Sequence, residues 1–252
     1  MYKEERKRYI INCLGLNDQV YTPDIAKQMH VSEITVRRDL IEMEKKGLLY
    51  RTHGGAIKTE YSQSLFSFDH RLNENAAEKE YICRLASGYI EEEDIIFIDC
   101  GTTLFRLCKF IKTFKKLTVI TNSLPVVSEL MSSDHIKTHL IGGEIINDRR
   151  AIYGFRAENN IMEYHANKAF IGSDGISLRK GLSSYDEKEA AITLKMMQST
   201  DITFLLCDSS KVEKDSFMAF APLNLLDFLI TDNGIDERII KEYEKRNIKV
   251  IS

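Results

Sequence analysis

Residues 22–47 read TPDIAKQMHVSEITVRRDLIEMEKKG and predict two helices separated by a tight turn. Thr22 is a favoured N-cap residue type, and Pro23 is tolerated in a first helical turn because its missing N–H would be unpaired there. Ser32 is expected to cap the second helix and Gly47 to end it. Apolar residues recur at helical spacing in both segments: Ile25, Ala26 and Met29, then Val36, Leu40 and Met43. The spacing predicts a helix-turn-helix with one buried face on each helix.

The outward face near the start of the second predicted helix carries hydroxyl and guanidinium groups, on Ser32, Thr35, Arg37 and Arg38. In a DNA-binding helix-turn-helix, this part of the recognition helix contacts base edges and phosphates. The alternative is an ordinary helical subdomain whose arginines face solvent.

The next segment, LLYRTHGGAIK at residues 48–58, predicts a small β-hairpin with Gly54 and Gly55 at its tip. Arg51 and His53 lie beside this turn, within expected reach of a phosphate or the minor groove. A two-helix unit followed by a basic hairpin is a winged helix-turn-helix.

The segment SEITVRRDLIEMEKKGLLYRTHGGA, residues 32–56, resembles the DNA-binding signature of the DeoR family of bacterial transcriptional regulators. The resemblance implies double-stranded operator DNA as a partner, and a homo-oligomer that presents several DNA-reading heads.

Composition is that of an ordinary globular protein, with 252 residues of which 43% are hydrophobic and 29% charged. The net charge of −3 is unevenly distributed along the chain. Residues 1–60 hold 11 basic and 9 acidic residues, a net charge of +2, and the remainder holds 24 and 29, a net charge of −5. No apolar run reaches membrane-spanning length and the N-terminus lacks a signal-peptide core, which predicts a cytoplasmic chain without a membrane partner. The five scattered cysteines, and His135 with His139, lack metal-ligand spacing, so neither metal nor cofactor is expected.

Seven short apolar runs predict strands in the rest of the chain, at 95–99, 117–121, 138–142, 168–172, 203–208, 228–231 and 249–251. Helical stretches lie between most of them, for example at 103–110, 124–132, 187–198 and 236–246. Such a pattern indicates a parallel sheet buried on both faces. The predicted fold class is α/β: a small winged helix-turn-helix domain at 1–57, a connecting segment at 58–75, and a larger, mostly parallel α/β sheet domain at 76–252.

Ligands of open α/β sheets bind at the carboxyl ends of the strands. The segments after the predicted strands supply small, hydroxyl and charged residues: Asp99, Gly101, Thr102, Thr103, Thr121, Asn122, Gly142, Gly143, Gly172, Asp174, Gly175 and Lys211. The turn at 101–103 offers N–H groups to an anion, Asp99 and Asp174 would accept from sugar hydroxyls, and Lys211 would pair with phosphate. The alternative is that these residue types only punctuate strand–helix junctions as turns and caps.

The resemblance to the DeoR family extends over these loops and over Glu189, at the start of the predicted helix 187–198. It implies an effector domain similar to ribose-5-phosphate isomerase, a phosphorylated sugar as effector, and a repressor of a sugar-catabolic operon. The alternative is an isomerase-like enzyme with an accessory helical head. In the related isomerases a second carboxylate stands where this sequence has Gly175, and a lysine- and glycine-rich loop is reduced here to residues 179–181. This departure favours binding without turnover.

Overall fold

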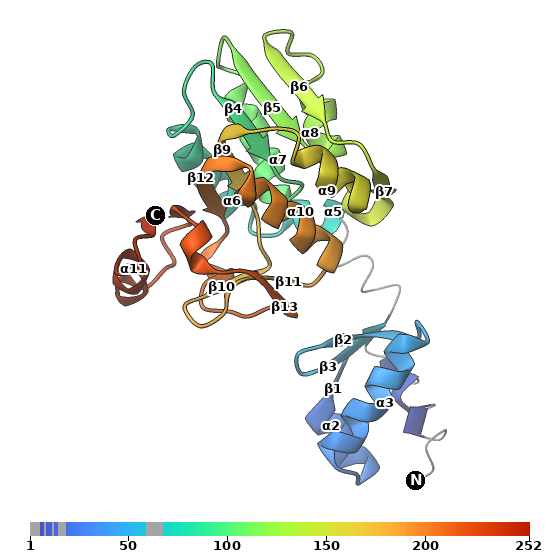
Figure 1. Cartoon of the computed structure of the whole chain (residues 1–252). Coiled ribbons are helices and arrows are strands. Elements are labelled where there is room, and N and C mark those ends of the chain that lie inside the picture. Colours follow the sequence, from blue (N-terminus) through green and yellow to red (C-terminus); the bar gives the residue numbers. More distant parts are fainter. Residues whose placement is uncertain (1–5, 8, 12, 15–18, 59–67) are drawn as a thin grey trace. The chain divides into compact units, whose positions relative to one another are not determined.

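The computed structural model describes residues 6–7, 9–11, 13–14, 19–58 and 68–252 (Figure 1). They divide into two compact units, one ending at His70 and the other beginning at Arg71. The division falls inside α5 (Phe68–Asn73), a helix within the segment expected to be a connection. The two units are described separately.

The predicted helix-turn-helix is confirmed as α2 (Thr22–Met29) and α3 (Glu33–Lys45), and the six apolar residues of its two stripes are buried. Ser32 caps α3, its hydroxyl accepting from the N–H of Thr35. Gly47 has a φ of +69°, and the N–H groups of Gly47 and Leu48 donate to Glu44 and Met43 in a Schellman motif. Thr22 is not the N-cap: Tyr21 holds that position, and the Thr22 N–H donates to the carbonyl of Gly54.

The wing forms a three-stranded antiparallel sheet in the order β1 (Gln19–Tyr21), β3 (Gly55–Lys58), β2 (Leu49–Thr52). Thr52 pairs with Gly55, so the two-residue tip is His53 and Gly54 rather than the predicted Gly54 and Gly55. Gly55 is buried against β1, where an added Cβ would lie 1.8 Å from the carbonyl oxygen of Val20. Glycine is therefore required at Gly55 for strand packing, and we expect no DNA contact from it.

The second unit contains a seven-stranded parallel sheet in the order β15-β14-β12-β9-β4-β5-β6. All seven predicted strands are present, as β4 (Ile95–Ile98), β5 (Leu117–Thr121), β6 (Ile136–Leu140), β9 (Ala166–Ile171), β12 (Thr200–Leu206), β14 (Phe228–Ile230) and β15 (Lys249–Ile251). The predicted α/β fold class is confirmed.

Helices cover both faces of this sheet, as its near-continuous apolar strands require. One face packs against α6 (Ala76–Ser87), α7 (Thr102–Ile111) and α8 (Leu124–Leu130). The other packs against α9 (Phe155–Ile161), α10 (Glu187–Gln198) and α11 (Glu237–Glu244). Two buried apolar clusters, one on each face, form the core of the unit.

Two small antiparallel elements were not predicted, because their strands have only three or four residues. One is the hairpin of β7 (Glu144–Ile146) and β8 (Ala151–Tyr153). The other is the sheet of β10 (Gly175–Ser177), β11 (Gly181–Ser184) and β13 (Met218–Ala221). Gly175 opens β10 and is buried, with the carbonyl oxygen of Lys214 2.4 Å from where a Cβ would stand.

The chain reverses its direction of winding between β4 and β9, which are neighbours in the sheet. From β4 it proceeds outward to β5 and β6, and from β9 outward through β12 to β14 and β15. The carboxyl ends of β4 and β9 therefore form the topological switch point, where open α/β sheets bind ligands.

Candidate DNA-binding face and ligand site

The outward face of α3 places the predicted DNA-reading side chains at the surface. Ser32, Arg37 and Arg38 are exposed and Thr35 is half-buried. The hydroxyl groups of Ser32 and Thr35 are 2.9 Å apart and hydrogen-bonded to each other. Arg37 reaches Glu33 at 3.4 Å with both side chains exposed, a pair too solvated to hold the guanidinium in place.

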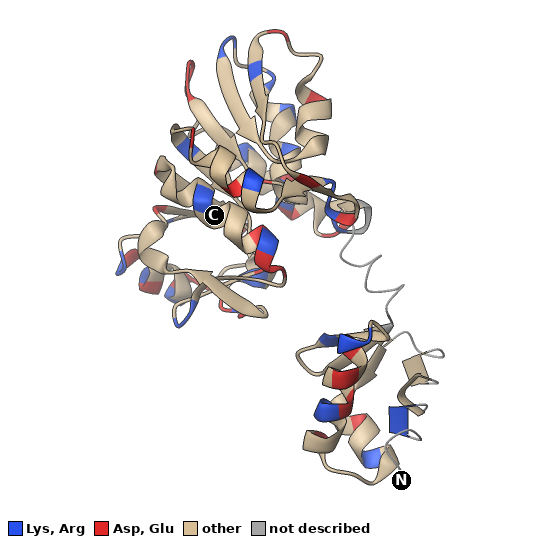
Figure 2. Cartoon of the chain, turned by 45° about the vertical axis from the view of Figure 1, so that its right-hand side comes forward, with Lys and Arg blue, Asp and Glu red and all other residues tan. Residues whose placement is uncertain are grey.

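Basic and acidic residues are interspersed along α3, and the acidic ones would repel DNA if unpaired (Figure 2). Neighbouring segments of the first unit neutralise three of them. The pairs are Arg6 with Asp39 at 2.6 Å, Lys7 with Glu42 at 2.7 Å and Arg51 with Glu44 at 2.7 Å. The fourth acidic residue of α3, the exposed Glu33, lies beside Arg37 on the outward face.

The wing residues are placed differently from one another. His53 and Gly54 are exposed at the tip. Arg51 is half-buried and its Nε donates to Glu44, so we expect it to contribute mainly by neutralising that carboxylate.

Ile34, which the sequence pattern did not single out, is 65% exposed in the first turn of α3. An apolar side chain there suits a thymine methyl group.

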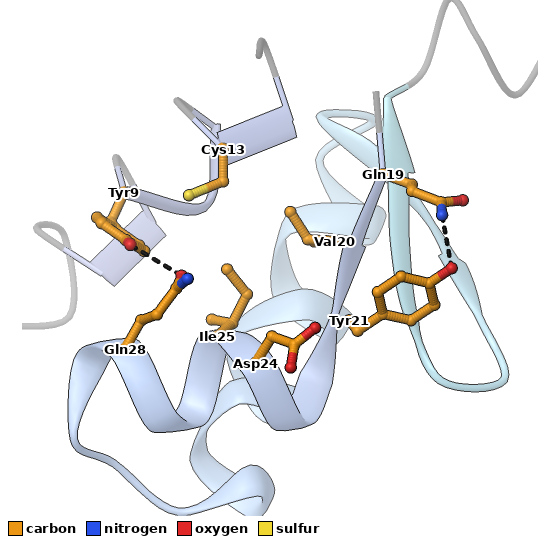
Figure 3. A pocket seen from close by; sticks show the side chains of 8 residues that line it. All are labelled: Tyr9, Cys13, Gln19, Val20, Tyr21, Asp24, Ile25 and Gln28. Carbon is orange, nitrogen blue, oxygen red and sulfur yellow. Dashed lines mark hydrogen bonds between the residues drawn. The ribbon is translucent and has the colours of Figure 1, made fainter. Parts of the chain in front are cut away.

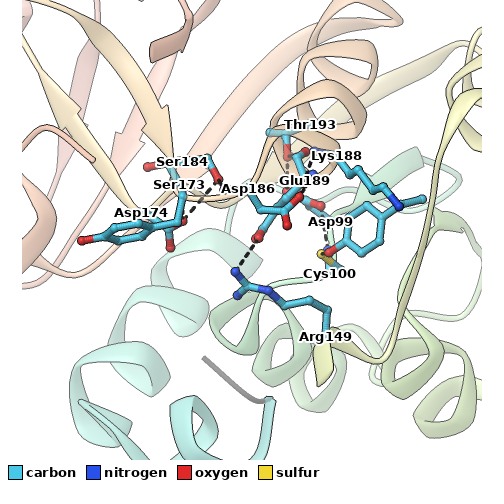
Figure 4. A network of polar contacts seen from close by, with 12 residues as sticks. Asp99, Cys100, Arg149, Ser173, Asp174, Ser184, Asp186, Lys188, Glu189 and Thr193 are labelled. Carbon is cyan, nitrogen blue, oxygen red and sulfur yellow. Dashed lines mark hydrogen bonds and ion pairs between the residues drawn. The ribbon is translucent and has the colours of Figure 1, made fainter. Parts of the chain in front are cut away.

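Charged side chains from several elements gather at the switch point of the second unit. We refer to them as the charged cluster: Arg71, Lys79, Asp99, Arg149, Asp174, Glu189 and Lys211. Asp99 follows β4, Asp174 follows β9, and Glu189 lies in the first turn of α10. Figure 4 shows Arg149 pointing toward Glu189, with Asp174 to one side of them and Asp99 and Cys100 to the other.

Asp99 is buried and fully engaged within the protein. Its carboxylate accepts from the N–H of Cys100 at 2.7 Å, the hydroxyl of Thr193 at 2.9 Å and the N–H of Gly172 at 3.4 Å. Burial raises the pKa of Asp99 even against these donors. The predicted role as a sugar-hydroxyl acceptor is therefore disfavoured, because Asp99 instead joins the ends of β4 and β9 to α10.

Glu189 and Arg149 form an ion pair at 3.2 Å. Burial raises the pKa of Glu189, although the positive charge of Arg149 acts in the opposite direction. Burial would lower the pKa of Arg149, but the negative charges of Glu189 and Asp174 together raise it. Asp174 accepts from the hydroxyl of Ser184 and the N–H of Tyr185. Burial opposes its ionisation, but Lys211 and the other surrounding donors and cations hold its pKa below the ordinary value.

The cationic side consists of Arg71, Lys79 and Lys211. Lys79 donates to the carbonyl of Arg71 and to the hydroxyl of Thr102 at 3.2 Å, and Lys211 donates to the carbonyl of Ser173 at 3.1 Å. Burial lowers the pKa of Lys79 to about 8, and the nearby charge of Lys211 adds to the effect. Cations this close are costly unless an anion joins them.

Several buried polar atoms of this region lack a hydrogen-bond partner among the described residues. They are Nε and Nη2 of Arg71, Nη1 of Arg149, Oγ of Ser173 and Oε2 of Glu189, the last close to Arg149 but without hydrogen-bond geometry. Buried donors are normally satisfied. Four such residues at one sheet edge indicate a place for a polar ligand.

Not every predicted ligand residue joins the charged cluster. Thr102 and Thr103 are buried in the first turn of α7, which Gly101 precedes as N-cap, and Gly172 adjoins Asp99. Thr121 and Asn122 are fully buried, and Asn122 donates to the carbonyl of Ile152. Gly142 and Gly143 follow the edge strand β6, and Gly143 packs against Tyr153 of β8. Gly143 and Gly175 serve hairpin and strand packing, whereas a Cβ at the exposed Gly142 would meet nothing within 4 Å, and Oδ1 of Asn122 is buried with no hydrogen-bond partner among the described residues.

A pocket of about 370 Å³ in the first unit lies apart from the charged cluster (Figure 3). Its lining includes Tyr9, Cys13, Tyr21 and Gln28, with Asp24 as its one charged residue, and the hydroxyl of Tyr9 donates to Gln28 at 2.9 Å. It offers no cation to a phosphate, so we place the ligand site at the switch point.

Comparison with known families now identifies the chain. Residues 6–61 match the DeoR-like helix-turn-helix domain, and residues 74–233 match the DeoR C-terminal sensor domain. The chain belongs to the DeoR family. It is a DNA-binding transcriptional regulator, with the first unit as DNA-binding unit and the second as sensor unit.

Full-length relatives in the DeoR family include the HTH-type transcriptional repressor GlcR of Bacillus subtilis, 35% identical over 100% of this chain and 96% of that protein. The lactose phosphotransferase system repressor of Staphylococcus epidermidis is 34% identical over 100% of both chains. Among solved structures, ribose-5-phosphate isomerase A of Methanocaldococcus jannaschii matches 56% of each chain at 14% identity and a TM-score of 0.41. A match of this extent carries no conclusion about a reaction shared with the isomerase.

The described part of this DeoR-family chain contains no group of three or more His, Cys, Asp or Glu placed to hold a metal ion. Nε2 of His135 instead hydrogen-bonds with the carbonyl of Lys112 at 3.1 Å, and the ring of His139 lies tilted against that of Tyr164. Within the same residues, no helix combines the length and apolarity needed to cross a membrane.

Proposed function

We propose that this DeoR-family protein represses a sugar-catabolic operon and that a phosphorylated sugar, bound at the charged cluster, changes its affinity for operator DNA. The observation that carries the proposal is the buried guanidinium group of Arg71 at the switch point, whose Nε and Nη2 have no hydrogen-bond partner among the described residues. A phosphate group offers the charge and the multiple acceptors that such nitrogens need. The two repressors named above, to which the chain is similar over its whole length, support the proposal.

Within this site we assign the phosphate to Arg71, Lys79, Lys211 and the N-terminus of α7, where aligned N–H groups favour an anion. The sugar hydroxyls would meet Asp174 and the Arg149–Glu189 pair. We also propose a cytoplasmic homo-oligomer, because two recognition helices reading repeated half-sites give the affinity that one lacks.

Binding without turnover is the role we favour for the sensor unit. Aldose–ketose isomerisation needs a free carboxylate base beside the substrate. Asp99 accepts three hydrogen bonds within the protein, and Glu189 is paired with Arg149. Asp174 remains at the site, but its low pKa makes it a weak base, and Gly175, where the related isomerases carry a second carboxylate, is buried in β10.

The test is selection of bound duplexes from a random DNA pool with the full chain, followed by gel shifts of the selected site with a panel of phosphorylated and unphosphorylated sugars. We expect a repeated site whose shift changes with one phosphorylated sugar and not with its unphosphorylated form. Turnover of a pentose phosphate without any selected site would contradict the proposal.

Asp174→Ala is expected to leave operator affinity within about twofold and to weaken the effector by about tenfold, since a charged hydrogen bond is worth roughly 1.5–3 kcal/mol. Titration calorimetry of the effector and gel shifts of the operator measure the two quantities. Asp134→Ala, which removes an exposed carboxylate before β6, is the control, and equal effector affinity in Asp174→Ala and the parent would exclude Asp174 from the site.

Effector affinity is also expected to fall as the pH rises above 8. The pKa of Lys79 is about 8, lowered by burial and Lys211, with Asp208, Arg71 and Glu74 also nearby. A phosphate monoester stays dianionic from about pH 7 to 9 because its second pKa is about 6. The phosphate dianion binds the protonated amine of Lys79 better than the neutral one. The effector affinity is therefore highest below pH 8 and falls by up to about tenfold per pH unit above it. Calorimetry at pH 7 and 9 checks this, and equal affinities would contradict it.

A further inference from the structure

The outward side of α9 leaves two large apolar side chains uncovered. Phe155, at the start of the helix, is 77% exposed, and Met162, at its C-cap, is 58% exposed. Seven residues of an α-helix make nearly two full turns, so both side chains lie on the same side of α9. Single exposed apolar residues are ordinary on a protein surface, whereas a group of them indicates a surface that another molecule covers.

The edge of the seven-stranded sheet continues this apolar surface. The N–H of Gly142, just after the edge strand β6, donates to Oδ1 of Asn160 at 3.1 Å, and the ring centroids of His139 and Tyr164 are 5.6 Å apart. These contacts place the end of β6 beside the end of α9 (Figure 1). Leu140, the last residue of β6, is 41% exposed there. We refer to the following residues as the α9 patch: Leu140, Phe155, Arg156, Asn159, Met162 and Glu163.

The charges of the α9 patch allow two copies of it to complement each other. Arg156 lies at one end of the patch and Glu163 at the other, and both are exposed. Neither forms an ion pair with another described residue, and the carboxylate of Glu163 accepts from the amide of Asn160 at 3.1 Å. If two α9 helices pack antiparallel, Arg156 of each copy lies near Glu163 of the partner subunit, and Asn159 lies close to the two-fold axis.

We propose that the α9 patch is the surface through which the sensor units of two copies of this chain associate, with their α9 helices antiparallel about a two-fold axis. This rests on the homo-oligomer of the proposed function and names the surface that forms it. A two-fold contact uses the same patch on both subunits, so the patch has to be complementary to itself. Its apolar side chains supply affinity, and its two charges set the direction in which the helices pack.

The experiment measures the association of the full chain by sedimentation equilibrium, without DNA or effector. The double variant Phe155→Ser/Met162→Ser removes the apolar contacts. Its control is Phe217→Ser, which replaces a side chain that is 66% exposed outside the α9 patch. The double variant is expected to raise the dissociation constant of subunit association by at least about tenfold, because two large apolar side chains lose their cover. The control should match the parent.

Charge reversals test the antiparallel arrangement. Arg156→Glu and Glu163→Arg each place like charges across the proposed contact, and the swap Arg156→Glu/Glu163→Arg restores opposite charges there. Each single reversal is expected to raise the dissociation constant by about tenfold, and the swap to return it to within about threefold of the parent. Lys241→Glu, at an exposed position of α11, is the control for a reversed charge and should leave association unchanged. All the replaced side chains are exposed, so the fold should persist in every variant.

Three outcomes would contradict this account, and they differ from one another. An unchanged dissociation constant in Phe155→Ser/Met162→Ser overturns the proposal and leaves the α9 patch to a different partner. A swap that associates no better than the single reversals overturns the antiparallel arrangement. A parent that stays monomeric, both alone and on its selected operator, refutes the homo-oligomer of the proposed function itself.

Discussion

The double variant Arg37→Ala/Arg38→Ala is expected to bind the selected operator at least about 100-fold more weakly than the parent. Each arginine contact to a base or phosphate contributes roughly 1–3 kcal/mol, and both side chains are exposed on α3 with no buried partner among the described residues. The loss should leave the fold intact, since neither side chain belongs to the core.

Anisotropy titrations of the operator at several salt concentrations measure the effect, with Arg238→Ala, an exposed arginine on α11, as control. Loss of two phosphate contacts would also reduce the slope of log affinity against log salt by about two. If Arg37→Ala or Arg38→Ala alone binds DNA with a relaxed sequence preference, the arginine replaced in that variant contacts a base. Parental affinity in the double variant would refute the assignment of α3 as the recognition helix.

Asp39→Ala is expected to destabilise the DNA-binding unit by about 3 kcal/mol. Asp39 is buried and receives Nε of Arg6 at 2.6 Å and Nη2 at 3.0 Å, a bidentate pair that fixes the first helical residues to α3. Removing the carboxylate leaves the guanidinium in a largely buried position, which typically costs 3–5 kcal/mol. A unit of 70 residues has only a few kcal/mol of stability, so much of it would unfold.

Hydrogen exchange measured by peptide separates the two units within the full chain. Protection of α2 and α3 should collapse in Asp39→Ala while the sensor unit keeps its own. Lys46→Ala is the control on the same segment, because its pair with Glu42 at 3.9 Å is exposed and should change stability by less than about 0.5 kcal/mol. Unchanged protection in Asp39→Ala would show that the pair does not hold the unit together.

The elements with a strong period or a cap were predictable from the sequence. The apolar stripes of α2 and α3, the Gly47 stop and the seven apolar strands all have local causes, and each is found as predicted. The short antiparallel strands β7, β8, β10, β11 and β13 and the helix α5 were missed because such short segments show no clear period. The shift of the wing tip to His53 follows from pairing with β1, which the hairpin sequence does not encode.

The ligand site was predictable only where it follows a strand. Asp174 and Lys211 stand directly after predicted strands, and they do join the charged cluster. Arg71, Lys79 and Arg149 lie in no motif, and only folding brings them to the switch point. Asp99 and Asn122 have suitable residue types, yet their side chains make hydrogen bonds within the protein, which sequence position alone does not reveal.

The central claim is that operator and phosphorylated sugar bind one protein at two linked sites, and linkage requires the coupling to be reciprocal. The most direct test measures operator affinity with and without saturating sugar, and sugar affinity with and without saturating operator. We predict the same factor in both directions, at least about fivefold. Sugar binding that leaves operator affinity unchanged would contradict the account.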